Sequence, residues 1–249
     1  MTDAKFKDHF SATAAAYAIF RPRYPTALFD FIASLAPARR LAWDCATGNG
    51  QAAVPLAERF ERVIATDASA DQIARATPHP RAEYRVALAD ASGIDAASVD
   101  LITVAQALHW LPLERFTAEV RRVIAPGGVL AVWCYTRPLL GGALDTLLDE
   151  YYSGELRAYW YPERHLVETG YSTLELPFTD LPTPRFQIEV PLTLQQFAGY
   201  MRTWSATQRR AAEVGYDPVA AVEQRLRAVW GEETQVVRWP VHVRAGVVR

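Results

Sequence analysis

The chain has 249 residues, of which 50% are hydrophobic and 22% are charged, and its formal net charge is −2. This size and composition predict a globular protein with one large core, a single domain over residues 1–249. A charge so close to zero provides no general attraction to nucleic acid or anionic membranes, and no apolar run is long enough to span a bilayer. We therefore expect no nucleic-acid partner, no membrane association and, because the N-terminus lacks the apolar centre of a signal peptide, a cytoplasmic location.

The first 40 residues combine an aromatic segment with an amphipathic helix. Four apolar residues recur there at helical spacing: Leu28, Phe31, Ile32 and Leu35. A proline near each end of this pattern, Pro25 and Pro37, marks the helix boundaries. We expect the segment before the helix to fold over the neighbouring site as a lid, so that residues 1–40 form a lid and a first helix.

Five apolar segments alternate with helical patterns in the next part of the chain. They span residues 41–45, 62–66, 84–88, 99–105 and 129–135. The helical pattern before the fifth segment stops at a Pro-Gly-Gly turn, residues 126–128. Parallel strands need helical crossovers of this kind, so residues 41–136 are predicted to form a doubly wound, Rossmann-like α/β core.

The chain after residue 136 follows a looser pattern. Residues 137–185 and 194–230 carry aromatic and helical signals and predict a cap built from helical insertions. Alternating apolar residues in 186–193 and 234–248 predict two closing strands, which bring the sheet to seven. Pro240 lies in the last strand and predicts an edge or a bulge, because proline cannot donate a ladder hydrogen bond.

A glycine-rich turn follows the first predicted strand. Residues Asp44–Gly50 contain Gly48 and Gly50, which allow the backbone to approach a ligand closely, and the next helix directs its amide groups at the same place. Asp67 closes the second strand, where a carboxylate can accept both hydroxyls of a ribose. The pattern indicates a site for a nucleoside cofactor.

Two cofactors fit this outline. Gly48–Ala53 matches the dinucleotide fingerprint G-x-G-x-x-A and is compatible with NAD. Asp44 would repel a diphosphate, whereas S-adenosylmethionine has no phosphate and carries an ammonium and a sulfonium. Asp90 ends the third strand, where it can bind the adenine amino group. The Tyr-x-x-x-Lys pair of short dehydrogenases does not occur, since the only lysines are Lys5 and Lys7.

These motifs resemble those of class I S-adenosylmethionine-dependent methyltransferases. Asp44–Gly50 is similar to the first motif of that family, with Ala46 in place of its first glycine. Asp67 and Asp90 match the acids on the ribose and adenine sides, and Ala125–Leu130 resembles the late Pro-Gly-Gly turn. The resemblance implies S-adenosylmethionine as cofactor, S-adenosylhomocysteine as product and an antiparallel last strand. An NAD(P)-dependent oxidoreductase and a non-catalytic nucleoside-sensing domain are the alternatives.

A narrower resemblance concerns the acceptor side. Tyr17–Pro25, His109–Trp110 and Tyr200–Ser205 resemble segments of the small-molecule type 11 methyltransferases, in particular the trans-aconitate methyltransferase-like group, which esterifies a carboxylate. This likeness implies a small-molecule acceptor that presents a carboxylate or hydroxyl oxygen, and a monomeric or homodimeric protein.

The candidate residues form two groups, and each member also has an ordinary explanation as a cap, a turn or a core residue. The cofactor-binding candidates are Asp44, Ala46, Thr47, Gly48, Gly50, Asp67, Ala68, Asp90, Ala91, Gln106 and Ala107. The acceptor-binding candidates are Tyr17, Arg21, His109, Trp110, Tyr135 and Trp204.

His109 is the catalytic candidate, as a general base for a hydroxyl or amine or as a group that orients a carboxylate. Arg21 can hold a carboxylate in two-pronged geometry. Cys45 and Cys134 end predicted buried strands, so we expect neither a disulfide nor a metal site.

Overall fold

The computed structural model describes residues 22–231 and 233–249, and a seven-stranded sheet forms its centre. In spatial order the strands are β3 (Ala82–Val86), β2 (Arg62–Asp67), β1 (Leu41–Cys45), β4 (Val99–Ala105), β5 (Ile124–Tyr135), β7 (Gln235–Val247) and β6 (Phe186–Leu192). The first five are parallel, and β7 runs antiparallel to both of its neighbours. The predicted Rossmann-like α/β fold with an antiparallel last strand is confirmed.

Helices cover both faces of the sheet. One core layer contains the buried sides of α2 (Thr26–Leu35) and α3 (Ala53–Ala57), and the other contains that of α5 (Leu113–Val123). Within β5, Trp133 belongs to the first layer and Cys134 to the second, because successive side chains of a strand point to opposite faces. The short helix α4 (Ala70–Ala74) is capped by Ser69, whose hydroxyl accepts the Gln72 amide.

The third and fifth strands differ most from their predicted boundaries. The third strand spans Ala82–Val86 instead of residues 84–88. The fifth begins at Ile124, so the Pro-Gly-Gly sequence lies inside β5, where the pairing with β4 shifts between Val99 and Leu101. A Cβ at Gly128 would lie 2.6 Å from the Ile124 side chain, so this irregular stretch requires glycine.

The edge position predicted for the Pro240 segment is wrong, because β7 lies between β5 and β6. The Pro240 carbonyl accepts the Thr136 amide just beyond the end of β5, whose last pair is Tyr135 with Val241. A residue's N–H and C=O point to the same side of a strand. An N–H at position 240 would therefore point toward β5, but β5 ends at Tyr135, before it reaches this position. The proline thus removes no hydrogen bond between β5 and β7.

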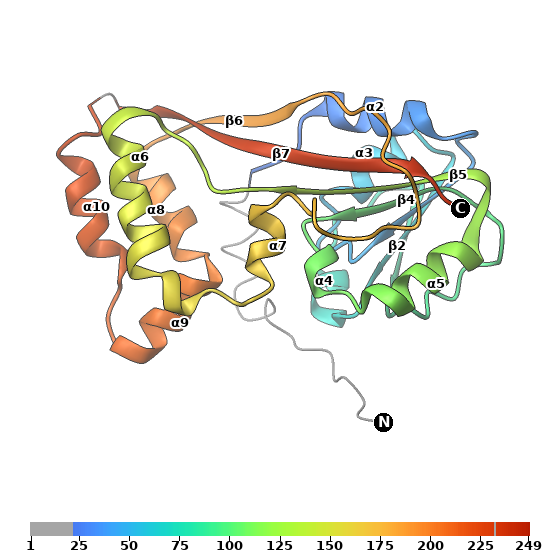
Figure 1. The fold of residues 1–249 in the computed structure, drawn as a ribbon, viewed down its shortest axis with the longest axis horizontal. Helices are drawn as coiled ribbons and strands as arrows, with labels where there is room; N and C mark the ends of the chain where they lie inside the picture. The colour runs from blue at the N-terminus through green and yellow to red at the C-terminus, as the bar shows by residue number, and fades with distance from the viewer. Residues whose placement is uncertain (1–21, 232) are drawn as a thin grey trace.

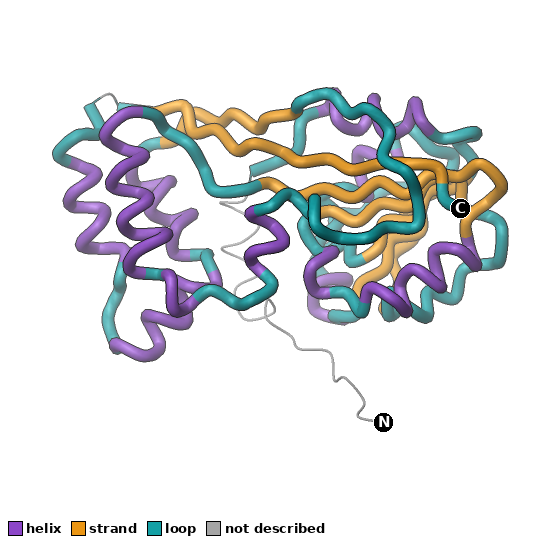
Figure 2. Tube along the Cα trace, viewed as in Figure 1, coloured by secondary structure: helices purple, strands orange, loops and turns teal. Residues whose placement is uncertain are grey.

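A helical cap extends beyond the sheet, at the far ends of the long strands β6 and β7 (Figures 1 and 2). Its elements are α6 (Gly142–Asp149), the π-helical turn η3 (Glu150–Glu155), the short turn η4 (Arg157–Tyr159), α8 (Leu194–Arg202), α9 (Ser205–Val214) and α10 (Val219–Arg227). Helix α10 packs against α6 and α8, and α7 (Arg164–Glu168) lies between the cap and the core. In the described part of the chain, no helix has the length and hydropathy that a membrane crossing requires.

Candidate active site

Asp44 lies at the base of the glycine-rich turn that follows β1. It is fully buried, and it accepts hydroxyl hydrogen bonds from Thr47 at 2.5 Å and from Thr103 at 2.8 Å. Burial raises the pKa of Asp44 to about 6, and the negative charge of nearby Asp67 adds to the rise. This carboxylate is therefore held inside the strand end and is not a solvated turn residue.

Asp67 ends β2 beside the same turn. Its Oδ2 accepts the backbone N–H of Gly48 at 2.9 Å, and its Oδ1 accepts the N–H of Ser69 at 2.8 Å. Gly48 has a φ of +58°, and a Cβ built there would meet no atom nearer than 3.9 Å, so the turn borders open space. A nucleoside cofactor fits here, because a carboxylate offers about four acceptor positions and the glycine admits a ligand to the backbone.

Two other residues of the turn have unusual backbone geometry. Ala46 has a φ of +55°, a left-handed conformation that costs a non-glycine residue about 1 kcal/mol or more. Gly50 has a φ of +88°, and a Cβ there would lie 2.5 Å from the Tyr84 hydroxyl, which itself donates to the Thr77 carbonyl at 2.7 Å. Gly50 therefore serves the packing of the turn against β3, whereas Gly48 faces the open side.

Asp90, predicted to bind the adenine, follows β3 and forms an ion pair with Arg115 of α5. The Asp90 side chain is only 7% exposed, so its ion pair with Arg115 links the end of β3 to α5 whether or not a cofactor is bound. Of the remaining candidates near the cofactor, Ala68 and Ala107 are half-buried and Ala91 is exposed. Their cofactor contacts stay predictions.

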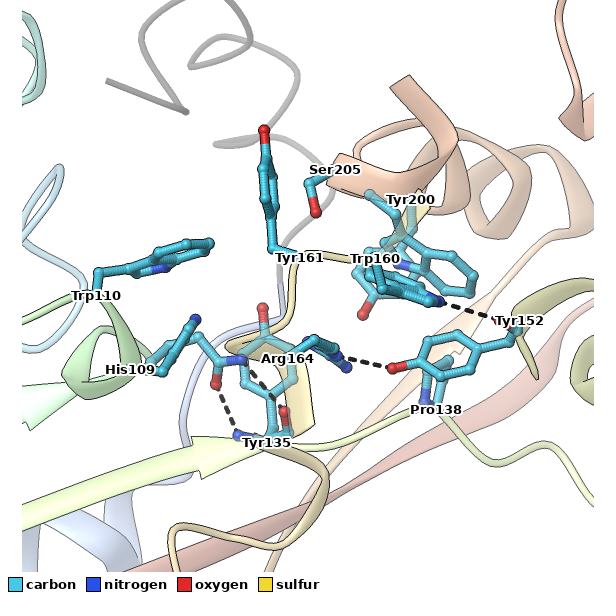
Figure 3. Close-up of a pocket in the computed structure, with 12 residues that line it drawn as sticks. His109, Trp110, Tyr135, Pro138, Tyr152, Trp160, Tyr161, Arg164, Tyr200 and Ser205 are labelled. Atoms are coloured by element: carbon cyan, nitrogen blue, oxygen red, sulfur yellow. Dashed lines mark hydrogen bonds between the residues drawn. The ribbon is translucent and has the colours of Figure 1, made fainter. Parts of the chain in front are cut away.

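An open pocket lies between the carboxyl ends of β4 and β5 and the helical cap (Figure 3). Its mouth is open to solvent, and the space counted with that opening is about 660 Å³. The core and the cap both contribute to the lining, which consists of Gln106, His109, Trp110, Tyr135, Pro138, Tyr152, Trp160, Tyr161, Arg164, Tyr200, Trp204 and Ser205.

Several residues predicted from the sequence meet in this pocket. His109, Trp110, Tyr135 and Trp204 were expected to bind the acceptor, and Gln106 was expected on the cofactor side. Trp204 is nearly buried and contacts Trp160, with ring centroids 6.0 Å apart. Tyr17 and Arg21, the other two acceptor candidates, lie outside the described residues.

Gln106 joins the ends of β4 and β5. Its Nε2 donates to the Tyr135 carbonyl at 3.3 Å, and its Oε1 accepts the Tyr135 N–H at 2.7 Å. Its own backbone has a φ of +57° and donates to the Trp133 carbonyl at 2.8 Å. These bonds fix the sharp turn that carries the chain from β4 into the pocket.

His109 follows that turn in the 3₁₀ segment η2 (Leu108–Trp110). Its Nδ1 lies 2.9 Å from the hydroxyl oxygen of Tyr171. Burial lowers the pKa of His109 to about 3, and the positive charge of Arg164 lowers it further, so the imidazole is neutral at pH 7.

The neutral imidazole carries one proton, and the direction of its bond to Tyr171 depends on which ring nitrogen holds that proton. Burial raises the pKa of Tyr171 well above its usual range, so this tyrosine keeps its proton. We assign the Tyr171 hydroxyl as the donor to Nδ1 of His109, an assignment that places the single imidazole proton on Nε2.

Tyr171 reaches His109 through a left-handed turn after α7. Gly170 and Tyr171 have φ values of +61° and +60°, and a Cβ at Gly170 would lie 2.7 Å from the His242 ring. A fully buried tyrosine in this conformation stores strain, and strained residues cluster at functional sites. Sequence reasoning missed Tyr171, for which the only local signal is the glycine before it.

Arg164, the first residue of α7, was also missed. Its Nε donates to the Tyr152 hydroxyl at 2.8 Å, and its guanidinium carbon lies 5.0 Å from the Trp160 ring centroid. Tyr152 belongs to the π-helical turn η3, where consecutive Tyr151 and Tyr152 are both buried. Such turns occur often at functional sites and would not be seen as a helical pattern in the sequence.

The chain is similar to proteins that are named methyltransferases. A family model described as a methyltransferase domain matches residues 43–132. A methyltransferase of Dictyostelium discoideum is 33% identical over 208 residues, which cover 82% of this chain and 79% of that protein. A methyltransferase of Mycobacterium tuberculosis is 35% identical over 130 residues, which cover 51% of this chain and 52% of that protein.

A solved structure agrees with these matches. A protein from Anaeromyxobacter dehalogenans, named as a type II methyltransferase, superposes with a TM-score of 0.87 at 46% identity. The alignment covers 92% of this chain and 98% of the other. The similarity thus extends over nearly the whole length of both chains.

Proposed function

The chain belongs to the S-adenosylmethionine-dependent methyltransferases, and from this premise we propose that it methylates a carboxylate or hydroxyl oxygen of a small molecule. Family membership removes the oxidoreductase and the non-catalytic sensing domain as alternatives. When it is bound, S-adenosylmethionine supplies a methyl group that is already activated by the positive sulfur. The acceptor class and the site that holds it are the subject of the proposal.

The position of the pocket carries this proposal. Strands β1 and β4 are neighbours in the sheet, so the turn after Asp44 and the turn at Gln106 lie at adjacent strand ends. Gln106 also lines the pocket. An acceptor in the pocket would therefore lie next to a cofactor bound at the glycine-rich turn, as open α/β sheets bind ligands at the carboxyl ends of their strands.

The pocket residues can contribute mainly by orientation and by the exclusion of water. With the cofactor bound, a carboxylate oxygen would bond to the methyl carbon as the carbon–sulfur bond breaks and its electron pair stays on sulfur; a hydroxyl acceptor would in addition lose its proton to solvent. Near-attack alignment of this kind is worth up to about 7–11 kcal/mol. Aromatic side chains such as Trp110, Trp160 and Trp204 can align an apolar acceptor and keep water out.

A carboxylate acceptor requires no base, because its oxygen is already ionised. The neutral His109 with its proton on Nε2 is suited to orient such an oxygen and is a poor base for a hydroxyl. The resemblance to trans-aconitate methyltransferases supports the same acceptor class. Arg21 is proposed to help bind it.

A panel of small carboxylic acids, phenols and alcohols tests this function. The release of S-adenosylhomocysteine is measured for the wild type and for His109→Phe, and calorimetry with S-adenosylhomocysteine checks the cofactor site of both proteins. We expect turnover with at least one oxygen acceptor, and a loss of turnover without a loss of cofactor affinity in His109→Phe. Turnover with amine acceptors alone would contradict the proposal.

A further inference from the structure

A single guanidinium lies in the acceptor pocket without an acidic partner. Arg164 lines the pocket between His109 and Tyr152 (Figure 3). Within residues 22–231 and 233–249, no carboxylate forms an ion pair with it. The nearest acidic connection is indirect, since the Tyr152 hydroxyl that accepts from Arg164 itself donates to Glu168 at 3.2 Å. Half-buried charges are normally paired, so this one is suited to an external anion.

The neighbours of Arg164 determine which of its guanidinium N–H groups can bind a ligand. Its guanidinium packs over Trp160 at 5.0 Å and over Tyr152 at 5.6 Å, and the bond to Tyr152 occupies its Nε. The two Nη groups are then the donors that can face a ligand in the pocket. Because the guanidinium already occupies these aromatic faces, the pocket would repel a cationic acceptor.

His109 adds a second donor on the same side of the pocket. Its Nδ1 is engaged by Tyr171, so the Nε2–H is the polar group that it can offer to a ligand. The imidazole and the guanidinium are close enough for the charge of Arg164 to influence His109. The guanidinium and the imidazole together carry a charge of +1, which matches a carboxylate better than a dianionic phosphate.

We propose that Arg164 and the Nε2–H of His109 together bind a carboxylate of the acceptor, and that this pair selects acids over neutral or cationic molecules. The proposal rests on the proposed function, because it assigns the acceptor to the same pocket. Arg164 is then a specificity-determining residue. Tyr152 and Tyr171 are positioning residues that hold the two donors.

Matched pairs of acids and amides test this selection without a known acceptor. The probes are phenylacetate and phenylacetamide, benzoate and benzamide, hexanoate and hexanamide, and glutarate and glutaramide. Each is titrated into the protein saturated with S-adenosylhomocysteine, and tryptophan fluorescence reports binding, since Trp110, Trp160 and Trp204 line the pocket. We expect the acid of at least one pair to bind roughly tenfold more tightly than its amide. Equal affinities in every pair would overturn the proposal.

Variants then assign the preference to Arg164. We expect Arg164→Gln to remove the preference for the acid and Arg164→Lys to keep part of it, because lysine retains the charge but not the fork of donors. Arg157→Gln is the matched control, since Arg157 is an exposed arginine of the neighbouring η4. A preference that survives in Arg164→Gln would overturn the proposal, and unchanged affinity for S-adenosylhomocysteine shows that each variant is folded.

Failure of this proposal and failure of the proposed function give different results. If the wild type methylates alcohols or phenols and Arg164→Gln is equally active on them, the function stands and the carboxylate site is refuted. If acids bind through Arg164 but no oxygen acceptor is methylated, the carboxylate site stands and the proposed function fails.

Discussion

Replacing Asp67 with asparagine tests how the cofactor is held. Asp67 accepts two backbone amides at once, those of Gly48 at 2.9 Å and Ser69 at 2.8 Å. An asparagine side chain has one acceptor oxygen and one donor NH2, so one of these backbone amides would face a donor. The same change removes one charged acceptor from the ribose hydroxyls.

The expected loss follows from the bonds affected. A hydrogen bond to a charged group contributes about 1.5–3 kcal/mol, and its neutral replacement keeps part of this. We therefore expect Asp67→Asn to weaken the binding of S-adenosylhomocysteine by about 1–3 kcal/mol, which is a factor of roughly 5 to 150 in Kd. The loosened turn should also lower the stability of the protein without ligand.

Titration calorimetry with S-adenosylhomocysteine measures the first effect, and thermal unfolding of the ligand-free protein measures the second. Asp71→Asn is the matched control, because Asp71 is an exposed aspartate in the first turn of the neighbouring α4. The control should leave both quantities unchanged. If folded Asp67→Asn binds S-adenosylhomocysteine within twofold of the wild type, the assignment of Asp67 to the ribose is refuted.

Three further predictions concern ionisation and positioning. Burial raises the pKa of Asp44 to about 6, so this acid loses its charge as the pH falls through 6. The affinity for S-adenosylmethionine, which carries an ammonium and a sulfonium, should therefore fall between pH 7 and pH 5. Asp44→Asn should remove that dependence in calorimetry, and a wild-type affinity independent of pH would contradict the reasoning. Tyr171→Phe removes the hydrogen bond to His109, so it should lower the stability of the protein by about 1 kcal/mol and slow methyl transfer. Nitrogen NMR of the variant should show a mixture of imidazole tautomers. A variant that keeps one tautomer and the wild-type rate would show that Tyr171 does not position His109. Hydrogen bonds from Arg122 lower the pKa of buried Glu119 from 4.5 to about 2, so its stabilisation of about 3 kcal/mol is complete above pH 4.5 and lost toward pH 2. Urea unfolding of Glu119→Gln between pH 3 and pH 7 should show a weaker loss of stability in acid than the wild type, and an equal loss would refute this.

The sheet was predictable from the sequence because its central strands are buried on both faces and leave continuous apolar runs. Strand β4, for example, is buried from Val99 to Val104 and was predicted with its observed boundaries. The third strand was predicted over residues 84–88, but it ends at Val86, and its apolar residue Val86 and the later Leu88 are 57% and 48% exposed. Apolar residues at a sheet edge do not have to be buried.

The two sides of the site differ in how far they could be predicted. The cofactor turn is contiguous in sequence, so Asp44, Gly48 and the later Asp67 form a motif that can be recognised. The acceptor side depends on contacts between distant segments, such as the bond between His109 and Tyr171, which are 62 residues apart. Arg164 begins a short helix, and Tyr171 lies in the left-handed turn that follows it. Neither the helix nor the turn has a sequence periodicity from which it could be predicted.

The central claim is that a cofactor at the glycine-rich turn faces an acceptor pocket lined by His109 and Arg164. A crystal structure of the protein with S-adenosylhomocysteine tests it most directly. The account predicts that the ribose hydroxyls contact Asp67 and that the sulfur atom lies at the edge of the pocket beside Gln106 and His109. A nucleoside bound away from Asp67, or a sulfur atom that points away from the pocket, would contradict it.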